Sequence, residues 1–123
     1  MNILLAGGAG YIGSHTTVSL IASGHNVIIM DNFSNSCLEV INRVEKITSQ
    51  NIKLYELDIK DKNGLRKAFG ENSIDCVIHF AGLKAVGESI EHLLMYYRNN
   101  IDTTLTLLEC MRGFGVNNIV FSS

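Results

Sequence analysis

Short apolar runs alternate along this chain with longer segments of helical pattern, and this alternation restricts the fold more than any other feature. The expected strands are Ile3–Ala6, Val27–Met30, Ile52–Leu57, Cys76–Phe80 and Ile119–Phe121. The expected helices are Tyr11–Ser23, Leu38–Thr48, Lys62–Phe69 and Leu93–Arg112. Buried-type strands that alternate with helices are typical of βαβ units. We therefore predict an α/β fold with a doubly wound parallel sheet, whose ligands bind at the carboxyl ends of the strands.

Composition narrows the class of protein further. The 123 residues suffice for one domain, and 46% hydrophobic with 18% charged residues is ordinary for a globular protein. With a net charge of -2 and no basic stripe, a nucleic-acid partner is not expected. The apolar stretches are broken well before the roughly 18 residues that span a bilayer, and no basic segment precedes the first one. No membrane partner is therefore expected.

The three cysteines, Cys37, Cys76 and Cys110, are odd in number and far apart. They form no CxxC pair, and the four histidines show no HExxH or comparable spacing, so no metal site is expected. Unpaired cysteines fit a reducing compartment, and we predict a cytoplasmic location.

A glycine-rich loop follows the first expected strand. It can be read as GxxGxxG from Gly7 or as GxGxxG from Gly8, with Gly10 and Gly13 shared by both readings. Such glycines let the backbone approach a pyrophosphate, whose charge is stabilised by the amides of the following helix. A side chain at Gly10 would occupy the space of the phosphate. The alternative is a turn that binds nothing.

Two aspartates end the next two strands. Asp31 lies about 20 residues beyond the loop, where a carboxylate can accept hydrogen bonds from the adenosine ribose hydroxyls. It would repel a 2′-phosphate, which favours NAD over NADP. Asp58 is placed to accept from an adenine amino group. A turn cap for Asp31 and a helix N-cap for Asp58 are the alternatives.

The block HFAGLKAVGES, from His79 to Ser89, is the most specific motif. Together with GGAGYIGSH, Asp31-Asn32 and Asp58-Ile59, it closely resembles the UDP-glucose 4-epimerases of the extended short-chain dehydrogenase/reductase family, over all 123 residues. The resemblance implies a Rossmann-type sheet with strand order 3-2-1-4-5 and a bound NAD. It also implies interconversion of UDP-glucose and UDP-galactose, part of galactose metabolism, through a 4-keto intermediate.

The resemblance also implies which residues hold the cofactor. The implied set is Gly7, Gly10, Tyr11, Ile12, Gly13, Asp31, Asn32, Phe33, Ser34, Asn35, Ser36, Asp58, Ile59, Phe80, Ala81, Gly82, Leu83, Lys84 and Asn99. A solvated lysine is the alternative for Lys84, a surface position for Asn99 and a core position for Phe80. His79 and Tyr97 are interpreted as packing residues.

The family's catalytic pair, Tyr-x-x-x-Lys, is absent from these 123 residues. The four tyrosines are followed four positions later by His15, Ile59, Asn100 and Ile101. We therefore expect an N-terminal fragment: an incomplete NAD-binding domain spanning residues 1–123, inactive by itself, that lacks the sixth strand and the UDP-sugar-binding domain. The alternatives are an NAD-binding chain without activity and another NAD-dependent sugar-nucleotide epimerase or dehydratase.

The long helix expected at Leu93–Arg112 carries one apolar stripe. Its members are Leu94, Tyr97, Ile101, Leu105, Leu108 and Met111. The resemblance implies a homodimer, because this family packs long helices across a two-fold axis. The alternative is that the sheet of the same chain covers the stripe.

Overall fold

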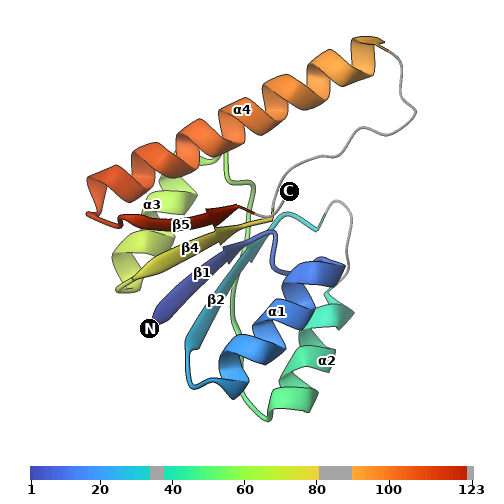
Figure 1. The fold of residues 1–123 in the computed structure, drawn as a ribbon, viewed down its shortest axis with the longest axis vertical. Coiled ribbons are helices and arrows are strands. Elements are labelled where there is room, and N and C mark those ends of the chain that lie inside the picture. The colour runs from blue at the N-terminus through green and yellow to red at the C-terminus, as the bar shows by residue number, and fades with distance from the viewer. Residues whose placement is uncertain (34–37, 81–89, 122–123) are drawn as a thin grey trace.

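Five strands and four helices alternate strictly along the chain in the computed structural model, which describes residues 1–33, 38–80 and 90–121 (Figure 1). The strands are β1 (Asn2–Ala6), β2 (Asn26–Asp31), β3 (Lys53–Glu56), β4 (Cys76–His79) and β5 (Asn118–Phe121). The helices are α1 (Tyr11–Ala22), α2 (Glu39–Thr48), α3 (Lys62–Glu71) and α4 (Ile90–Gly113). Each expected element is present, with ends displaced by up to three residues.

All strand pairs are parallel, and the order is β3-β2-β1-β4-β5. The predicted Rossmann-type topology is therefore confirmed. Pairing Leu4 with Ile28 on one side and Val77 on the other places β1 at the centre, where both of its neighbours bury it. Because the strands are parallel, their carboxyl ends lie along one edge of the sheet, next to the start of α1 (Figure 1).

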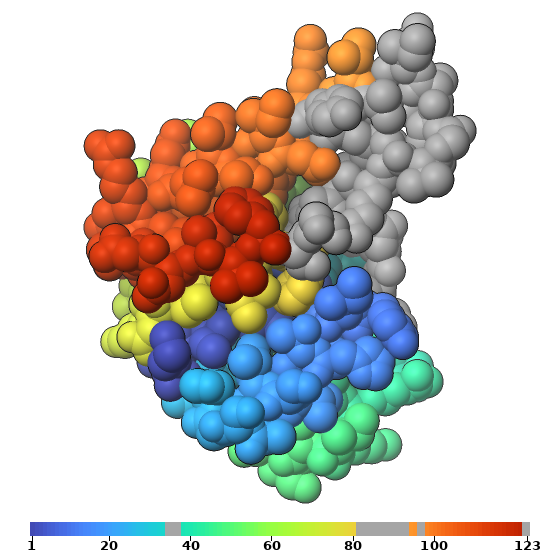
Figure 2. All heavy atoms as spheres, viewed as in Figure 1, coloured from blue at the N-terminus to red at the C-terminus, as the bar shows by residue number. Residues whose placement is uncertain are grey.

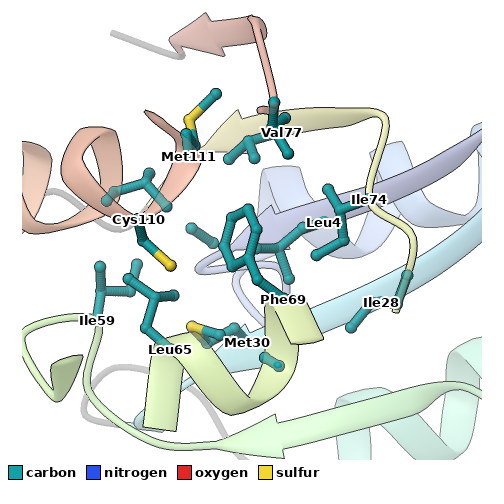
Figure 3. Packing of buried hydrophobic residues seen from close by; sticks show 14 residues of the cluster. Leu4, Ile28, Met30, Ile59, Leu65, Phe69, Ile74, Val77, Cys110 and Met111 are labelled. Atoms are coloured by element: carbon teal, nitrogen blue, oxygen red, sulfur yellow. The ribbon is translucent and has the colours of Figure 1, made fainter. Parts of the chain in front are cut away.

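The helices form one layer on each face of the sheet. Helices α3 and α4 cover one face, and α1 and α2 cover the other (Figure 1). The cluster beneath α3 and α4 has Phe69 at its centre, surrounded by side chains of β1, β2, β4 and α4 (Figure 3). The cluster beneath α1 and α2 is built on Ile3, Leu5 and Ile29. Burial of apolar side chains on both faces explains why these strands read as continuous apolar runs.

Local signals set the ends of two helices. Asp61 caps α3, because its carboxylate accepts a hydrogen bond from the backbone N–H of Gly64 at 3.1 Å. Helix α4 ends at Gly113, and Gly115 follows it with φ of 71°, a conformation that glycine adopts without strain.

The packed face of α4 differs from the predicted stripe. Among the side chains of α4 that the structure describes, the buried ones are Thr103, Leu107, Cys110 and Met111, of which Met111 belongs to the predicted stripe. Four members of the predicted stripe are exposed instead: Leu94, Ile101, Leu105 and Leu108. The alternative that the sheet covers this stripe is therefore wrong for these four residues. Instead, α4 packs Leu107, Cys110 and Met111 into the α3–α4 cluster with side chains of the sheet.

Strand β5 is the last strand at its edge of the sheet. Val120 and Phe121 are exposed, and Ile119 packs partly against the α3–α4 cluster. Figure 2 shows β5 at the surface, between α4 and β4. This edge therefore combines open backbone hydrogen-bonding groups with apolar side chains, a combination that favours association with further chain.

Candidate functional site

The glycine loop lies at the carboxyl edge of the sheet, between β1 and α1. Gly7 has φ of 85° and donates its N–H to the carbonyl of Met30 at 2.7 Å, which extends the β1–β2 pairing by one residue. Gly10 donates to the carbonyl of Gly7 at 3.3 Å and closes the turn into α1. Two backbone hydrogen bonds thus fix the start of the loop and its turn into α1.

The glycines of this loop have different surroundings. A Cβ at Gly13 would lie 2.7 Å from Cα of Gly8, and a Cβ at Gly8 would lie 2.8 Å from Cβ of Leu5. Both glycines are therefore required for close packing between loop, helix and strand. Among the described residues, a Cβ at Gly10 would meet only the carbonyl oxygen of Gly7, at 3.6 Å. Gly10 thus faces open space, as expected if that space is meant for a ligand.

The N-terminus of α1 is suited to an anion. No side chain caps it, and its first turn contains no acidic residue. The free backbone N–H groups and the helix dipole therefore favour negative charge at this point. Tyr11 and Ile12 are exposed beside it, at 81% and 50% of their full surface. These two apolar side chains on the first turn would gain from contact with a bound molecule.

Asp31 ends β2 next to this loop. Its Oδ2 accepts a hydrogen bond from the N–H of Ala9 at 3.1 Å, and its Oδ1 accepts from the N–H of Phe33 at 2.7 Å. The turn-cap interpretation of Asp31 is therefore correct. It does not exclude ligand binding, since two carboxylate oxygens offer about four acceptor sites. Asn32 is exposed, and Phe33 adopts φ of 58° in the turn that the carboxylate of Asp31 stabilises.

Asp58 and Ile59 follow β3 at the same edge. Asp58 is exposed and its Oδ1 accepts from the N–H of Lys60 at 2.9 Å, so it caps a local turn. The N-cap of α3 is Asp61, so the N-cap interpretation of Asp58 is wrong. The side chain of Ile59 is buried in the α3–α4 cluster, which leaves its backbone as the part that can face a ligand.

Lys60 is a residue that the sequence-based set missed. Its Nζ donates a hydrogen bond to Oδ1 of Asn99 at 2.7 Å, across 39 positions of the chain. Asn99 is half-buried on α4, so the surface interpretation of Asn99 is only partly correct. Nothing in the local sequence distinguishes Lys60 from any other exposed lysine in a polar loop. Only the packing of α4 across the sheet brings Lys60 and Asn99 together.

His79 and Phe80 end β4 beside β1. Phe80 is half-buried against the α1–α2 cluster and donates its N–H to the carbonyl of Ala6 at 2.6 Å. His79 is buried, with Nε2 3.2 Å from Oγ1 of Thr104 and its ring 5.5 Å from that of Phe121. Burial lowers the pKa of His79 from its ordinary value of 6.5. His79 thus packs between β4, α4 and β5, as predicted.

Some predicted site residues lie outside the described part of the chain. They are Ser34, Asn35, Ser36, Ala81, Gly82, Leu83 and Lys84. Among the described residues, no group of three or more His, Cys, Asp or Glu side chains could hold a metal ion. No helix within these same residues has the length and apolarity needed to cross a membrane.

Comparison with protein families gives one match across the site. The model of a family described as GDP-mannose 4,6 dehydratase matches residues 4–123.

Curated relatives are similar to this chain over nearly its whole length. The UDP-glucose 4-epimerase of Bacillus subtilis is 53% identical over 123 residues, and that of Neisseria meningitidis serogroup A is 55% identical over 122 residues. The chain spans 36% of the length of each of these proteins.

Solved structures share the fold. UDP-glucose 4-epimerase from Bifidobacterium longum, in complex with NAD+ and UDP, superposes with a TM-score of 0.96 at 46% identity. The match covers 100% of this chain and 37% of that one. The enzyme from Stenotrophomonas maltophila, with bound NAD and formylated UDP-arabinopyranose, has a TM-score of 0.94 at 44% identity, with the same coverage.

Proposed function

The chain belongs to the GDP-mannose 4,6 dehydratase family, and from this premise we propose that it is the NAD-binding part of a UDP-glucose 4-epimerase. The whole protein would interconvert UDP-glucose and UDP-galactose. Support for this substrate pair comes from the similarity to the Bacillus subtilis and Neisseria meningitidis enzymes. Residues 1–123 would be an incomplete dinucleotide-binding domain, and the sugar nucleotide would be held by residues outside them.

The observation that carries the cofactor proposal is the open space at Gly10. Gly10 immediately precedes the uncapped helix α1, and the bond from Ala9 fixes the carboxylate of Asp31 at the same loop. An anionic pyrophosphate fits the helix end, and ribose hydroxyls fit the remaining acceptor sites of Asp31. The N-terminus of α1 and the carboxylate of Asp31 lie next to each other, just as the pyrophosphate and the ribose are neighbours in a dinucleotide.

Each residue of the proposed site is assigned to one part of the cofactor or to the shape of the loop. Gly7, Gly10 and Gly13 shape the loop and Tyr11 and Ile12 cover the pyrophosphate. The adenosine would be held by Asp31, Asn32, Phe33, Asp58 and Ile59, together with Ser34, Asn35 and Ser36. The remaining contacts would come from Phe80 and Asn99, together with Ala81, Gly82, Leu83 and Lys84.

When bound, NAD supplies the redox chemistry of 4-epimerisation, since the nicotinamide can accept a hydride and return it. The residues present here bind and orient that group. Proton transfer at the sugar needs a tyrosine with a lysine four positions later, which residues 1–123 do not contain. We therefore expect these residues alone to bind NAD without turnover.

A homodimer through α4 is part of the proposal. The exposed side chains of Leu94, Ile101, Leu105 and Leu108 lie three to seven positions apart and so form one face of the helix. An exposed apolar helix face of this kind is typical of an interface. A location in the cytoplasm is also proposed, supported by the free thiols of Cys76 and Cys110.

Calorimetric titration with NAD tests the site through Gly10→Ala. The added methyl group meets no atom of the described residues closer than 3.6 Å, so folding should be preserved while the pyrophosphate is displaced. We expect at least about a tenfold loss of affinity, because close approach of backbone to phosphate is required. Gly113→Ala is the matched control, since its Cβ meets no atom of the described residues within 4 Å and lies far from the loop. Equal affinities of Gly10→Ala and the unmodified chain would refute the assigned site.

The activity proposal has a separate test. The codons that follow Ser123 should encode a Tyr-x-x-x-Lys motif in the same frame, and the protein that includes it should convert UDP-galactose to UDP-glucose. A continuation without this motif would leave an NAD-binding protein without epimerase activity. Conversion of a GDP- or UDP-sugar to its 4-keto-6-deoxy product would instead favour a dehydratase, which the family match also permits.

A further inference from the structure

The loop after β3 and the helix α4 meet through one charged hydrogen bond. Lys60 lies four residues beyond the end of β3, at the carboxyl edge of the sheet, and its Nζ donates to Oδ1 of Asn99 at 2.7 Å. The backbone of Lys60 is itself held by Asp58, whose Oδ1 accepts from its N–H at 2.9 Å. Asp58, Lys60 and Asn99 therefore form a chain of contacts that spans the edge from β3 to α4.

The hydrogen bond from Lys60 determines which end of the Asn99 carboxamide remains available to a ligand. A carboxamide offers one acceptor oxygen and two N–H donors. Because a lysine ammonium can only donate, it engages the oxygen and leaves the Nδ2 group for other partners. Among the residues whose side chains the structure describes, Nδ2 of Asn99 donates to no acceptor. Asn99 is thus oriented as a donor.

Lys60 also retains donor capacity. Its ammonium carries three N–H groups, of which the Asn99 bond uses one. In the described part of the chain it forms no ion pair, whereas Lys62, two positions later, lies 3.9 Å from Glu109. The pair therefore offers donors and one positive charge at the edge where the proposed cofactor would lie.

We propose that Lys60 is a positioning residue of the dinucleotide site, which holds Asn99 so that Nδ2 donates to an acceptor oxygen of the ADP moiety. This inference rests on the proposed NAD site and adds to it a residue outside the predicted set. ADP fits the pair because its phosphate and ribose oxygens are acceptors and its diphosphate is anionic. The adenosine half is favoured over the nicotinamide half because Lys60 follows directly on Asp58 and Ile59, the proposed adenine contacts.

The test is calorimetric titration of the 123-residue chain and its variants with NAD and with ADP. Lys60→Met removes the ammonium and keeps the aliphatic stem, and we expect affinity for both ligands to fall about three- to tenfold, the effect of one hydrogen bond. Lys62→Met is the matched control, because it removes the same charge two residues away without touching Asn99. We expect it to change affinity by less than about twofold, as a screened surface charge does.

Asn99→Asp separates the role in binding from a role in stability. An aspartate there still pairs with Lys60, so the free energy of unfolding in urea should not fall. It has no N–H donor, so affinity for ADP should fall at least as much as in Lys60→Met. In an Asn99→Ala background, Lys60→Met should cause no further loss beyond that of Lys62→Met.

The outcomes distinguish this inference from the proposed function. If the unmodified chain binds neither NAD nor ADP, the proposed function is overturned and the inference with it. If the chain binds both ligands and Gly10→Ala lowers NAD affinity at least about tenfold, the proposed site is supported. In that case, equal effects of Lys60→Met and Lys62→Met, or unchanged ADP affinity in Asn99→Asp, would overturn the role of Lys60 alone.

Discussion

The carboxylate of Asp31 accepts a hydrogen bond from the backbone N–H of Ala9 at 3.1 Å, and so joins the end of β2 to the glycine loop that follows β1. A second bond, from the N–H of Phe33 at 2.7 Å, fixes the turn that leaves β2. One side chain thus orders both loops that border the candidate site, before any ligand is bound.

This double role predicts a loss of stability in Asp31→Ala. Two backbone N–H groups lose a charged acceptor, and we expect the free energy of unfolding to fall by about 1 to 2 kcal/mol, since the site is partly open to water. Urea denaturation followed by circular dichroism measures this change. Asp58→Ala is the control, because Asp58 is exposed and accepts only one backbone bond, from Lys60. Equal losses in the two variants would contradict the assigned role of Asp31.

The same carboxylate predicts a preference for NAD over NADP. A 2′-phosphate on the ribose would lie next to the negative charge of Asp31, and removing that charge in Asp31→Ser should raise the ratio of NADP to NAD affinity at least about fivefold. Titration of both cofactors gives the ratio. In Asp58→Ala the two affinities should change together, and a ratio that Asp31→Ser leaves unaltered would show that the carboxylate does not face the ribose.

Burial of His79 predicts that acid destabilises the fold. The pKa of His79 is lowered in the folded state, so the unfolded state binds the proton more readily. The stability contributed by the neutral imidazole is therefore complete above its ordinary pKa of 6.5 and falls as the pH decreases below that value. The slope is at most about 1.4 kcal/mol per pH unit.

Urea denaturation between pH 7.5 and 5.5, roughly one unit on either side of the ordinary histidine value, measures this dependence. His79→Gln should flatten the curve, since glutamine can still bond to Thr104 and does not titrate. His15→Gln is the control, because His15 is exposed. A slope that persists in His79→Gln would assign the acid sensitivity to other groups.

The exposed stripe of α4 predicts association between copies of the chain. Leu105 is 53% exposed, and Leu105→Glu should weaken the dimer at least about tenfold, because an apolar side chain in an interface contributes about 1.5–3 kcal/mol. Sedimentation equilibrium measures the dimer dissociation constant. Ile47→Glu on α2, at a position 69% exposed, is the control for adding a charge elsewhere. Association that Leu105→Glu leaves intact would point to another surface, such as the edge strand β5.

Much of the fold could be predicted from local pattern. The period of apolar residues distinguishes strands from helices, and the strict alternation of the two implies a parallel sheet with all carboxyl ends on one edge. This is why the glycine loop, Asp31 and Asp58 could be assigned to a common edge before the structure was considered.

The sequence pattern could not choose between nearby residues of the same chemical type. Asp58 and Asp61 both precede α3, and only the backbone geometry makes Asp61 the cap. Leu107 and Leu105 are equally apolar, yet Leu107 is fully buried and Leu105 is 53% exposed, because the packing of α4 against the sheet determines which of its faces is covered.

The amino-acid sequence by itself thus determined the order of the elements, the edge at which the candidate site lies and the glycines that shape the loop, because each depends on neighbours within a few positions. The tertiary structure alone decided the packed face of α4, the bond from Ala9 to Asp31 and the pairing of Lys60 with Asn99. These contacts join residues 22 to 39 positions apart, or depend on how whole elements pack, and no local periodicity encodes such distances.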